Sequence, residues 1–157
     1  MDKVKITIDG IEMEVPKTYT ILDAAREAGI DIPTLCHLKG INEIGACRMC
    51  IVEVEGARGF ATSCVMPVSD GMVVKTNTPA IRDARRVTLE LLLSAHDKKC
   101  LTCVRNRNCE LQTLAEKMNI DDIAFEGEME RHPIDDLCPS IVRDPNKCIL
   151  CKRCVAM

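Results

Sequence analysis

Cysteine spacing is the feature that most limits what this chain can fold into. All eleven cysteines of the 157 residues fall into three groups. The groups are Cys36, Cys47, Cys50 and Cys64, then Cys100, Cys103 and Cys109, and last Cys138, Cys148, Cys151 and Cys154. Closely spaced thiolates, with Cys-x2-Cys pairs among them, are typical of iron–sulfur clusters or zinc rather than of disulfides. We therefore expect three metal centres, with zinc and iron–sulfur left open at this point.

The middle group also contains a histidine. The pattern His-x3-Cys-x2-Cys-x5-Cys runs from His96 to Cys109, so one centre can collect four ligands without long-range folding. A lone histidine is usually structural or exposed, but His96 stands at the head of a three-cysteine group that lacks a fourth sulfur. We expect His96 to be that fourth ligand. His37 and His132 have no such setting, and neither is expected to be a ligand.

Composition excludes several classes of protein. The chain has only three aromatic residues, so its apolar core is thin for several subdomains, and metal centres could supply the missing cross-links. No secretory signal opens the sequence, and no run of about 18 apolar residues could span a membrane. From these two features we expect a cytoplasmic location, and disulfides are rare in that compartment. With a net charge of −3 and no long basic block, nucleic acid is not an expected partner.

The N-terminal residues predict a hairpin and a helix. Apolar residues alternate through 4–8 and 11–15, and Asp9-Gly10 between them is a type I′ turn signal. Thr20, with Asp23 three residues later, marks the start of a short amphipathic helix that ends before Gly29. Further strands are expected over 51–54, 60–64 and 72–75. This order suggests a β-grasp domain over residues 1–78, for which a metal-free ubiquitin-like domain is the alternative.

The first cysteine group carries a family resemblance. Its spacing, Cys36-x10-Cys47-x2-Cys50-x13-Cys64, resembles the plant-type [2Fe–2S] ferredoxins in a longer form. That form is similar to the N-terminal domain of the large iron–sulfur subunit of respiratory complex I and of the iron-only hydrogenases. The resemblance implies one [2Fe–2S] cluster held by these four cysteines. Zinc on the same thiolates is the alternative.

Residues 79–120 are expected to form a small helical domain. Pro79 can start a helix, along which a stripe that includes Ile81, Arg85 and Leu91 runs at helical spacing, with Leu89 widening its apolar face. Arg82, Arg85 and Arg86 are expected to form a solvated flank, with a partner-facing flank as the alternative. A second short helix is expected over 110–119. The His-x3-Cys-x2-Cys-x5-Cys pattern resembles the histidine-ligated [4Fe–4S] cluster of the same families. The resemblance implies a cluster held by His96, Cys100, Cys103 and Cys109.

Residues 121–137 form an acidic stretch without periodicity, which we interpret as a surface connector. In the segment 138–157, Cys148-x2-Cys151-x2-Cys154 resembles the entry to the two-cluster ferredoxin domain of iron-only hydrogenases, where a distant Cys-Pro completes the cluster. No Cys-Pro follows Cys154, but Cys138-Pro139 precedes the group. We expect Cys138 to be the fourth ligand of a second [4Fe–4S] cluster, with a free cysteine as the alternative. The intervening connector would fold back at a turn near Pro145.

Together these expectations describe an α+β electron carrier with one [2Fe–2S] and two [4Fe–4S] clusters. The sequence contains no GxGxxG stretch, P-loop or serine–histidine arrangement, and no recognisable flavin site, so substrate chemistry is left to partners. The resemblance is strongest to the small iron–sulfur subunit of a three-subunit electron-bifurcating NAD(P) transhydrogenase. It implies a flavin-bearing, NADH-oxidising partner subunit, together with an NADPH-binding flavoprotein and ferredoxin. The alternatives are the electron-input fragment of an NAD(P)-linked iron-only hydrogenase or formate dehydrogenase, and a zinc-stabilised interaction protein.

Overall fold

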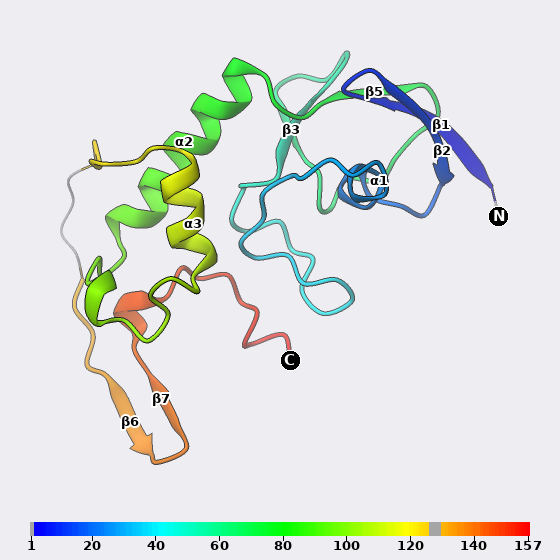
Figure 1. The fold of residues 1–157 in the computed structure, drawn as a ribbon. Helices are drawn as coiled ribbons and strands as arrows, with labels where there is room; N and C mark the ends of the chain where they lie inside the picture. The colour runs from blue at the N-terminus through cyan, green and yellow to red at the C-terminus, as the bar shows by residue number, and fades with distance from the viewer. Residues whose placement is uncertain (1, 126–129) are drawn as a thin grey trace. The chain divides into compact units, whose positions relative to one another are not determined.

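The computed structural model describes residues 2–125 and 130–157 (Figure 1). Its contacts divide the chain into two compact units. The first contains Met1–Arg85 together with Lys152–Met157, and the second contains Arg86–Cys151. These units do not test the four sequence segments proposed above, which stay a prediction. Among the described residues, no helix combines the length and the apolar character needed to cross a membrane.

The first unit contains a five-stranded mixed sheet. Its strands are β1 (Lys3–Ile8), β2 (Ile11–Pro16), β3 (Ile51–Val54), β4 (Phe60–Thr62) and β5 (Met72–Lys75), in the order β2-β1-β5-β3-β4. The β1–β5 pair is parallel, and the other pairs are antiparallel. Asp9 and Gly10 join β1 to β2 with φ values of 49° and 85°, as a type I′ turn requires. The predicted hairpin and the three later strands are confirmed.

Helix α1 (Ile21–Glu27) packs its apolar side into the same core as the sheet (Figure 1). Thr20 and Asp23 form a reciprocal capping box at its start, and Gly29 follows its end with a φ of 73°. Ile21 and Leu22 are fully buried beside strand residues such as Val52. A sheet of this order with one packed helix confirms the predicted β-grasp fold.

Helix α2 (Pro79–Ser94) begins where the sequence predicts, but its buried side differs from the prediction. Ile81, Arg85 and Leu89 are buried at four-residue spacing, so they share one face of the helix. Arg85 was expected on a solvated flank and is instead only 6% exposed, whereas Leu91 was expected on the apolar stripe and is 51% exposed. Ile81 and Arg85, which both belong to the predicted stripe, are therefore buried as its spacing requires, whereas the stripe does not extend to Leu91.

The second unit has little regular structure outside its helices. It contains the rest of α2, η1 (Cys100–Thr102), α3 (Glu110–Lys117), β6 (Asp135–Cys138), β7 (Ile141–Arg143) and η2 (Pro145–Lys147). The β6–β7 hairpin was not predicted, because β6 falls at the end of the acidic stretch and has no apolar alternation. Every residue of both strands is exposed. A turn is present at Pro145 as expected, in the form of η2, but the chain reverses between Cys138 and Ile141, in the β6–β7 hairpin.

Candidate metal centres

The first cysteine group is buried in the β-grasp unit. Cys36, Cys47, Cys50 and Cys64 are each at most 5% exposed, and none forms a disulfide. Cys36 and Cys47 lie in the long loop between α1 and β3, Cys50 immediately precedes β3, and Cys64 follows β4. The fold therefore brings together one end of the sheet and the loop after α1, as the sequence pattern predicts for a four-thiolate site.

The four thiols are close enough to influence one another's ionisation. A hydrogen bond with Cys50 raises the pKa of the Cys64 thiol, and burial and the charges of the other thiols act in the same direction. Burial likewise raises the pKa of Cys47, although backbone N–H groups such as that of Met49 donate to its sulfur and oppose this effect. Four buried thiolates are therefore unfavourable together unless a cation lies among them.

The loop that carries this group is shaped by buried polar contacts. Asn42 is 2% exposed, and its Nδ2 donates to the carbonyl of Cys36 at 2.8 Å. Gly45 has a φ of 63°, and a Cβ at this position would lie 3.1 Å from the Cγ2 of Thr62. Arg48, also left-handed with a φ of 57°, donates from Nη1 to Thr62 Oγ1 at 2.7 Å. Backbone N–H groups of Leu35, Cys36 and Met49 point inward at the sulfur of Cys47, which suits a negatively charged cluster.

The donor set fits an iron–sulfur cluster. Ferric iron would compensate the charge of the four buried thiolates, and the inward N–H groups can donate to sulfur. His37, next to Cys36, is buried and neither of its ring nitrogens has a partner among the described residues, so it offers a further N–H donor. Within the described part of the chain, no three His, Cys, Asp or Glu side chains are gathered into a site for a single metal ion.

The second group surrounds a cavity of about 350 Å³ in the other unit. His96, Cys100 and Cys109 line it, together with apolar residues of α2 and α3 such as Leu93 and Leu111. Cys103 lies in the same loop but does not line the cavity. Three of the four predicted ligands of this group thus line one cavity, and the fourth, Cys103, lies six residues before Cys109 in the sequence.

Within the described part of the chain, the burial and the free ring nitrogen of His96 suit a metal ligand. Its Nδ1 is buried and has no hydrogen-bond partner among the described residues. Burial lowers the pKa of His96, which favours the neutral ring. Because a metal binds the neutral form of imidazole, an unpartnered nitrogen of a neutral ring at the cavity wall fits the predicted role.

The loop between Cys103 and Cys109 is held by a residue that the sequence reasoning missed. Gln112 of α3 accepts from the backbone N–H of Arg107 at 2.9 Å and donates to Asn106 Oδ1 at 3.1 Å. Arg107 has a φ of 63°, which a non-glycine residue adopts only when its surroundings enforce it. Gln112 is therefore a positioning residue for this loop. The sequence did contain a signal for this role, because Gln112 is a polar residue in the first turn of a helix that directly follows a cysteine loop.

The third group is the least enclosed. Cys148, Cys154 and Cys138 are exposed, and Cys151 is half-buried. The backbone N–H of Leu150 donates to the sulfur of Cys148 at 3.4 Å, and Leu150 itself is left-handed with a φ of 54°. Cys138 pairs with Ile141 at the turn end of the β6–β7 hairpin, whereas Cys148 follows η2 at the other end. The structure thus forms the Cys148 turn but does not bring Cys138 beside it.

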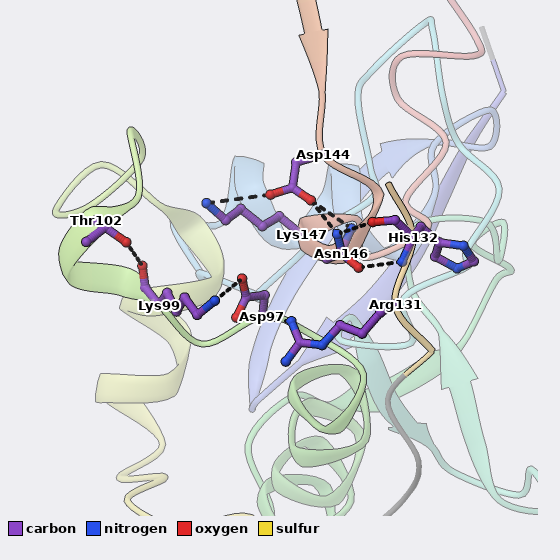
Figure 2. A network of polar contacts seen from close by, with 8 residues as sticks. All are labelled: Asp97, Lys99, Thr102, Arg131, His132, Asp144, Asn146 and Lys147. Carbon is purple, nitrogen blue, oxygen red and sulfur yellow. Dashed lines mark hydrogen bonds and ion pairs between the residues drawn. The ribbon is translucent and has the colours of Figure 1, made fainter. Parts of the chain in front are cut away.

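A polar network fixes the approach to Cys148 (Figure 2). The side chain of Asn146 exchanges two hydrogen bonds with the backbone of His132, at 3.0 and 2.9 Å. The backbone carbonyl of Asn146 accepts from the N–H of Asp97, the residue after His96, at 2.9 Å. Asp144 caps η2 by accepting from the N–H of Asn146. The network therefore ties the start of the third cysteine group to the residue that follows the histidine of the second.

Comparison with known proteins agrees with this arrangement. Residues 1–79 match the 2Fe-2S iron-sulfur cluster binding domain, which is half of the chain. The chain belongs to this family. Residues 85–124 match the NADH-ubiquinone oxidoreductase-G iron-sulfur binding region, which includes His96 and the second cysteine group. The predicted [2Fe–2S] domain, followed by a second iron–sulfur region, is thereby confirmed, while individual ligands and the number of [4Fe–4S] clusters stay predictions.

Members of this family resemble the chain over nearly all its length. It is 51% identical, over its whole length, to NADP-reducing hydrogenase subunit HndD of Solidesulfovibrio fructosivorans, of which it spans 28%. It is 41% identical, over 97% of its length, to the alpha subunit of an NADPH-Fe(3+) oxidoreductase of Geobacter sulfurreducens, of which it spans 18%. The resemblance to hydrogenase subunits is thereby confirmed. The resemblance to complex I subunits is confirmed as well, because the chain is 37% identical to a mitochondrial iron-sulfur protein of NADH dehydrogenase from Solanum tuberosum.

A solved structure shares the fold. A chain of an NAD+-reducing [NiFe]-hydrogenase in its H2-reduced state superposes with a TM-score of 0.91 at 32% identity. The match covers 98% of this chain and 64% of the other. The chain therefore spans only part of the length of each of these proteins.

Proposed function

We propose that this chain is an iron–sulfur electron-transfer unit of a multi-subunit, flavin-based NAD(P)-dependent oxidoreductase. The observation that carries the proposal is the placement of the candidate ligands: four buried thiols in the β-grasp unit, and a histidine with an unpartnered Nδ1 and two cysteines around a cavity in the second unit, among the described residues. Bound clusters would supply one-electron transfer. The names of the relatives, which include an NADP-reducing hydrogenase and an NADPH-Fe(3+) oxidoreductase, support the link to nicotinamide nucleotides.

The residues of the chain have distinct tasks in this proposal. Cys36, Cys47, Cys50 and Cys64 hold a [2Fe–2S] cluster away from water, which protects it and raises the influence of nearby charges. His96, Cys100, Cys103 and Cys109 hold a [4Fe–4S] cluster. Cys148, Cys151 and Cys154 hold a second one, with Cys138 as the proposed fourth ligand. Asn146 keeps the start of the third group next to the residue that follows His96.

The proposed partners are a flavin-bearing, NADH-oxidising iron–sulfur subunit and, for an electron-bifurcating complex in the cytoplasm, an NADPH-binding flavoprotein and ferredoxin. Purification of the native complex through a tag on this chain would test the proposal. We expect flavin-containing partner chains to copurify, and NADH or NADPH to reduce the clusters of the complex. A chain that copurifies with no flavoprotein, and whose clusters neither nucleotide reduces in the complex, would contradict the proposal.

The isolated chain is expected to reduce neither NAD nor NADP at a measurable rate. Hydride transfer to a nicotinamide needs a two-electron cofactor such as flavin, and the proposed clusters carry single electrons. Dithionite-reduced protein, mixed with either nucleotide, should therefore show no absorbance increase at the wavelength of the reduced nicotinamide. The same assay with the flavin-bearing partner added is the positive control. Tightly bound flavin in the isolated chain would overturn this expectation.

Histidine ligation of the second cluster should raise its potential. A neutral imidazole in place of a thiolate removes one negative charge from the cluster, which favours reduction, as in Rieske centres. We expect His96→Cys to lower the midpoint potential of this cluster in a titration followed by electron paramagnetic resonance. His132→Cys, at an exposed position, is the matched control and should change nothing. A midpoint potential that does not fall in His96→Cys, with the cluster still present, would contradict this direction.

A second candidate function is favoured by the 51% identity to a hydrogenase subunit. In that case the chain would be the electron-input part of an NADP-reducing hydrogenase. Two observations discriminate between the two candidate functions: the length of the native polypeptide and the identity of the neighbouring genes. Hydrogenase-type cysteines downstream in the same polypeptide, or in an adjacent reading frame, would support this candidate, and hydrogen-dependent reduction of the clusters in the purified complex would establish it.

A further inference from the structure

Arg85 is a buried cation whose position the function described so far does not explain. It is 6% exposed, although the sequence places it among arginines expected to be solvated. Its Nη2 donates to the carbonyl of Ile51 at 2.7 Å, and its Nε is buried without a hydrogen-bond partner among the described residues. The guanidinium is therefore held against the backbone next to Cys50 while part of its donor capacity is unused.

The described residues offer this cation no close anion. Arg85 takes part in none of their ion pairs, and Asp9 and Asp31 influence its pKa from beyond ion-pair distance. Burial lowers the pKa of Arg85, and the charge of Cys50 is the largest effect that opposes it. Arginine remains protonated at neutral pH even so. Burying an unpaired guanidinium is costly, so a compensating negative charge is expected near it.

We propose that Arg85 is the buried counter-charge of the [2Fe–2S] cluster and sets its reduction potential. The inference rests on the proposed function, because it requires a cluster on Cys36, Cys47, Cys50 and Cys64. Reduction adds one electron to a cluster that four thiolates already make negative. A fixed positive charge beside Cys50, in an environment without water to screen it, stabilises the reduced form more than the oxidised form. Arg85 acts as a positioning and tuning residue and not as a ligand.

The test is a potentiometric titration of the [2Fe–2S] signal in wild-type protein and three variants. Arg85→Gln removes the charge and keeps a donor for the carbonyl of Ile51. Arg85→Lys keeps the charge on a different head group. Arg82→Gln is the matched control, because Arg82 lies on the same helix and is exposed, and its side chain donates to the carbonyl of Asn77. The readout is the midpoint potential. If Arg85 had a merely structural role, this potential would not depend on whether the substituting residue carries a positive charge.

We expect Arg85→Gln to lower the equilibrium constant for reduction about tenfold, which is about 59 mV for a one-electron couple. Arg85→Lys should recover most of the shift, and Arg82→Gln should match wild type. An unchanged midpoint in Arg85→Gln overturns the inference. If Arg85→Gln fails to hold the cluster, retention by Arg85→Lys supports the role of the charge, and loss in both variants overturns it. Absence of a [2Fe–2S] signal from wild-type protein would instead contradict the proposed function.

Discussion

Replacing Cys50 with serine is expected to abolish the [2Fe–2S] signal and leave the other clusters in place. Cys50 is 1% exposed and its thiol shares a hydrogen bond with Cys64, so its loss removes one ligand and leaves a buried polar oxygen among three thiols. The other predicted ligands lie in separate segments, and His96, Cys100 and Cys109 line a cavity confined to the second unit. The iron content should fall by about two per chain.

Two measurements check this expectation. Electron paramagnetic resonance of dithionite-reduced protein should lose one signal, and iron analysis should give the matching loss. Cys148→Ser is the reciprocal control, because it should remove a [4Fe–4S] signal and preserve the [2Fe–2S] one. Disappearance of all three signals in Cys50→Ser would mean that the centres assemble as one cooperative unit, and the modular description would be wrong.

Cys138→Ser is expected to have the next largest effect. Cys148, Cys151 and Cys154 can hold three irons of a cubane, and the fourth iron needs another ligand. In that variant the iron content should fall from about ten per chain toward about six, or to about nine if an oxygen-labile [3Fe–4S] centre remains. Since the structure places Cys138 in the exposed turn of the β6–β7 hairpin, this role also requires the hairpin to change its position when the cluster is loaded.

The hairpin offers a matched control for this prediction. Ser140→Ala changes the same turn two residues away and removes no candidate ligand, so it should leave the iron content unchanged. If Cys138→Ser keeps its full iron content and an unchanged cluster spectrum, Cys138 is a free thiol. The fourth ligand of that cluster would then come from another polypeptide segment, a partner subunit or water.

Local signals explain why the N-terminal half could be predicted well. The Asp9-Gly10 turn, the capping box of Thr20 and Asp23 and the alternation in β1 and β2 act over a few residues, and the structure confirms each. The grouping of the first four cysteines also follows from spacing, because Cys47 and Cys50 lie just before β3 and Cys64 lies just after its partner strand β4. Features that depend on neighbours in the sequence were therefore accessible without a structure.

Features that depend on distant contacts were not. Arg85 is buried because its helix position faces the carbonyl of Ile51, 34 residues away, and no helical pattern of apolar residues can reveal such a partner. Gln112 was missed because its partners lie in an irregular loop. The β6–β7 hairpin was missed because strands exposed on all sides lack the alternation that identifies a half-buried strand.

The central claim, that the cysteines and His96 hold iron–sulfur clusters, is tested most directly by metal and sulfide analysis of anaerobically purified protein. The account predicts a brown protein with about ten irons and about ten acid-labile sulfides per chain, for one [2Fe–2S] and two [4Fe–4S] clusters. Electron paramagnetic resonance of the reduced sample should resolve their separate signals. A colourless protein that contains zinc, with neither iron nor labile sulfide, would contradict the account.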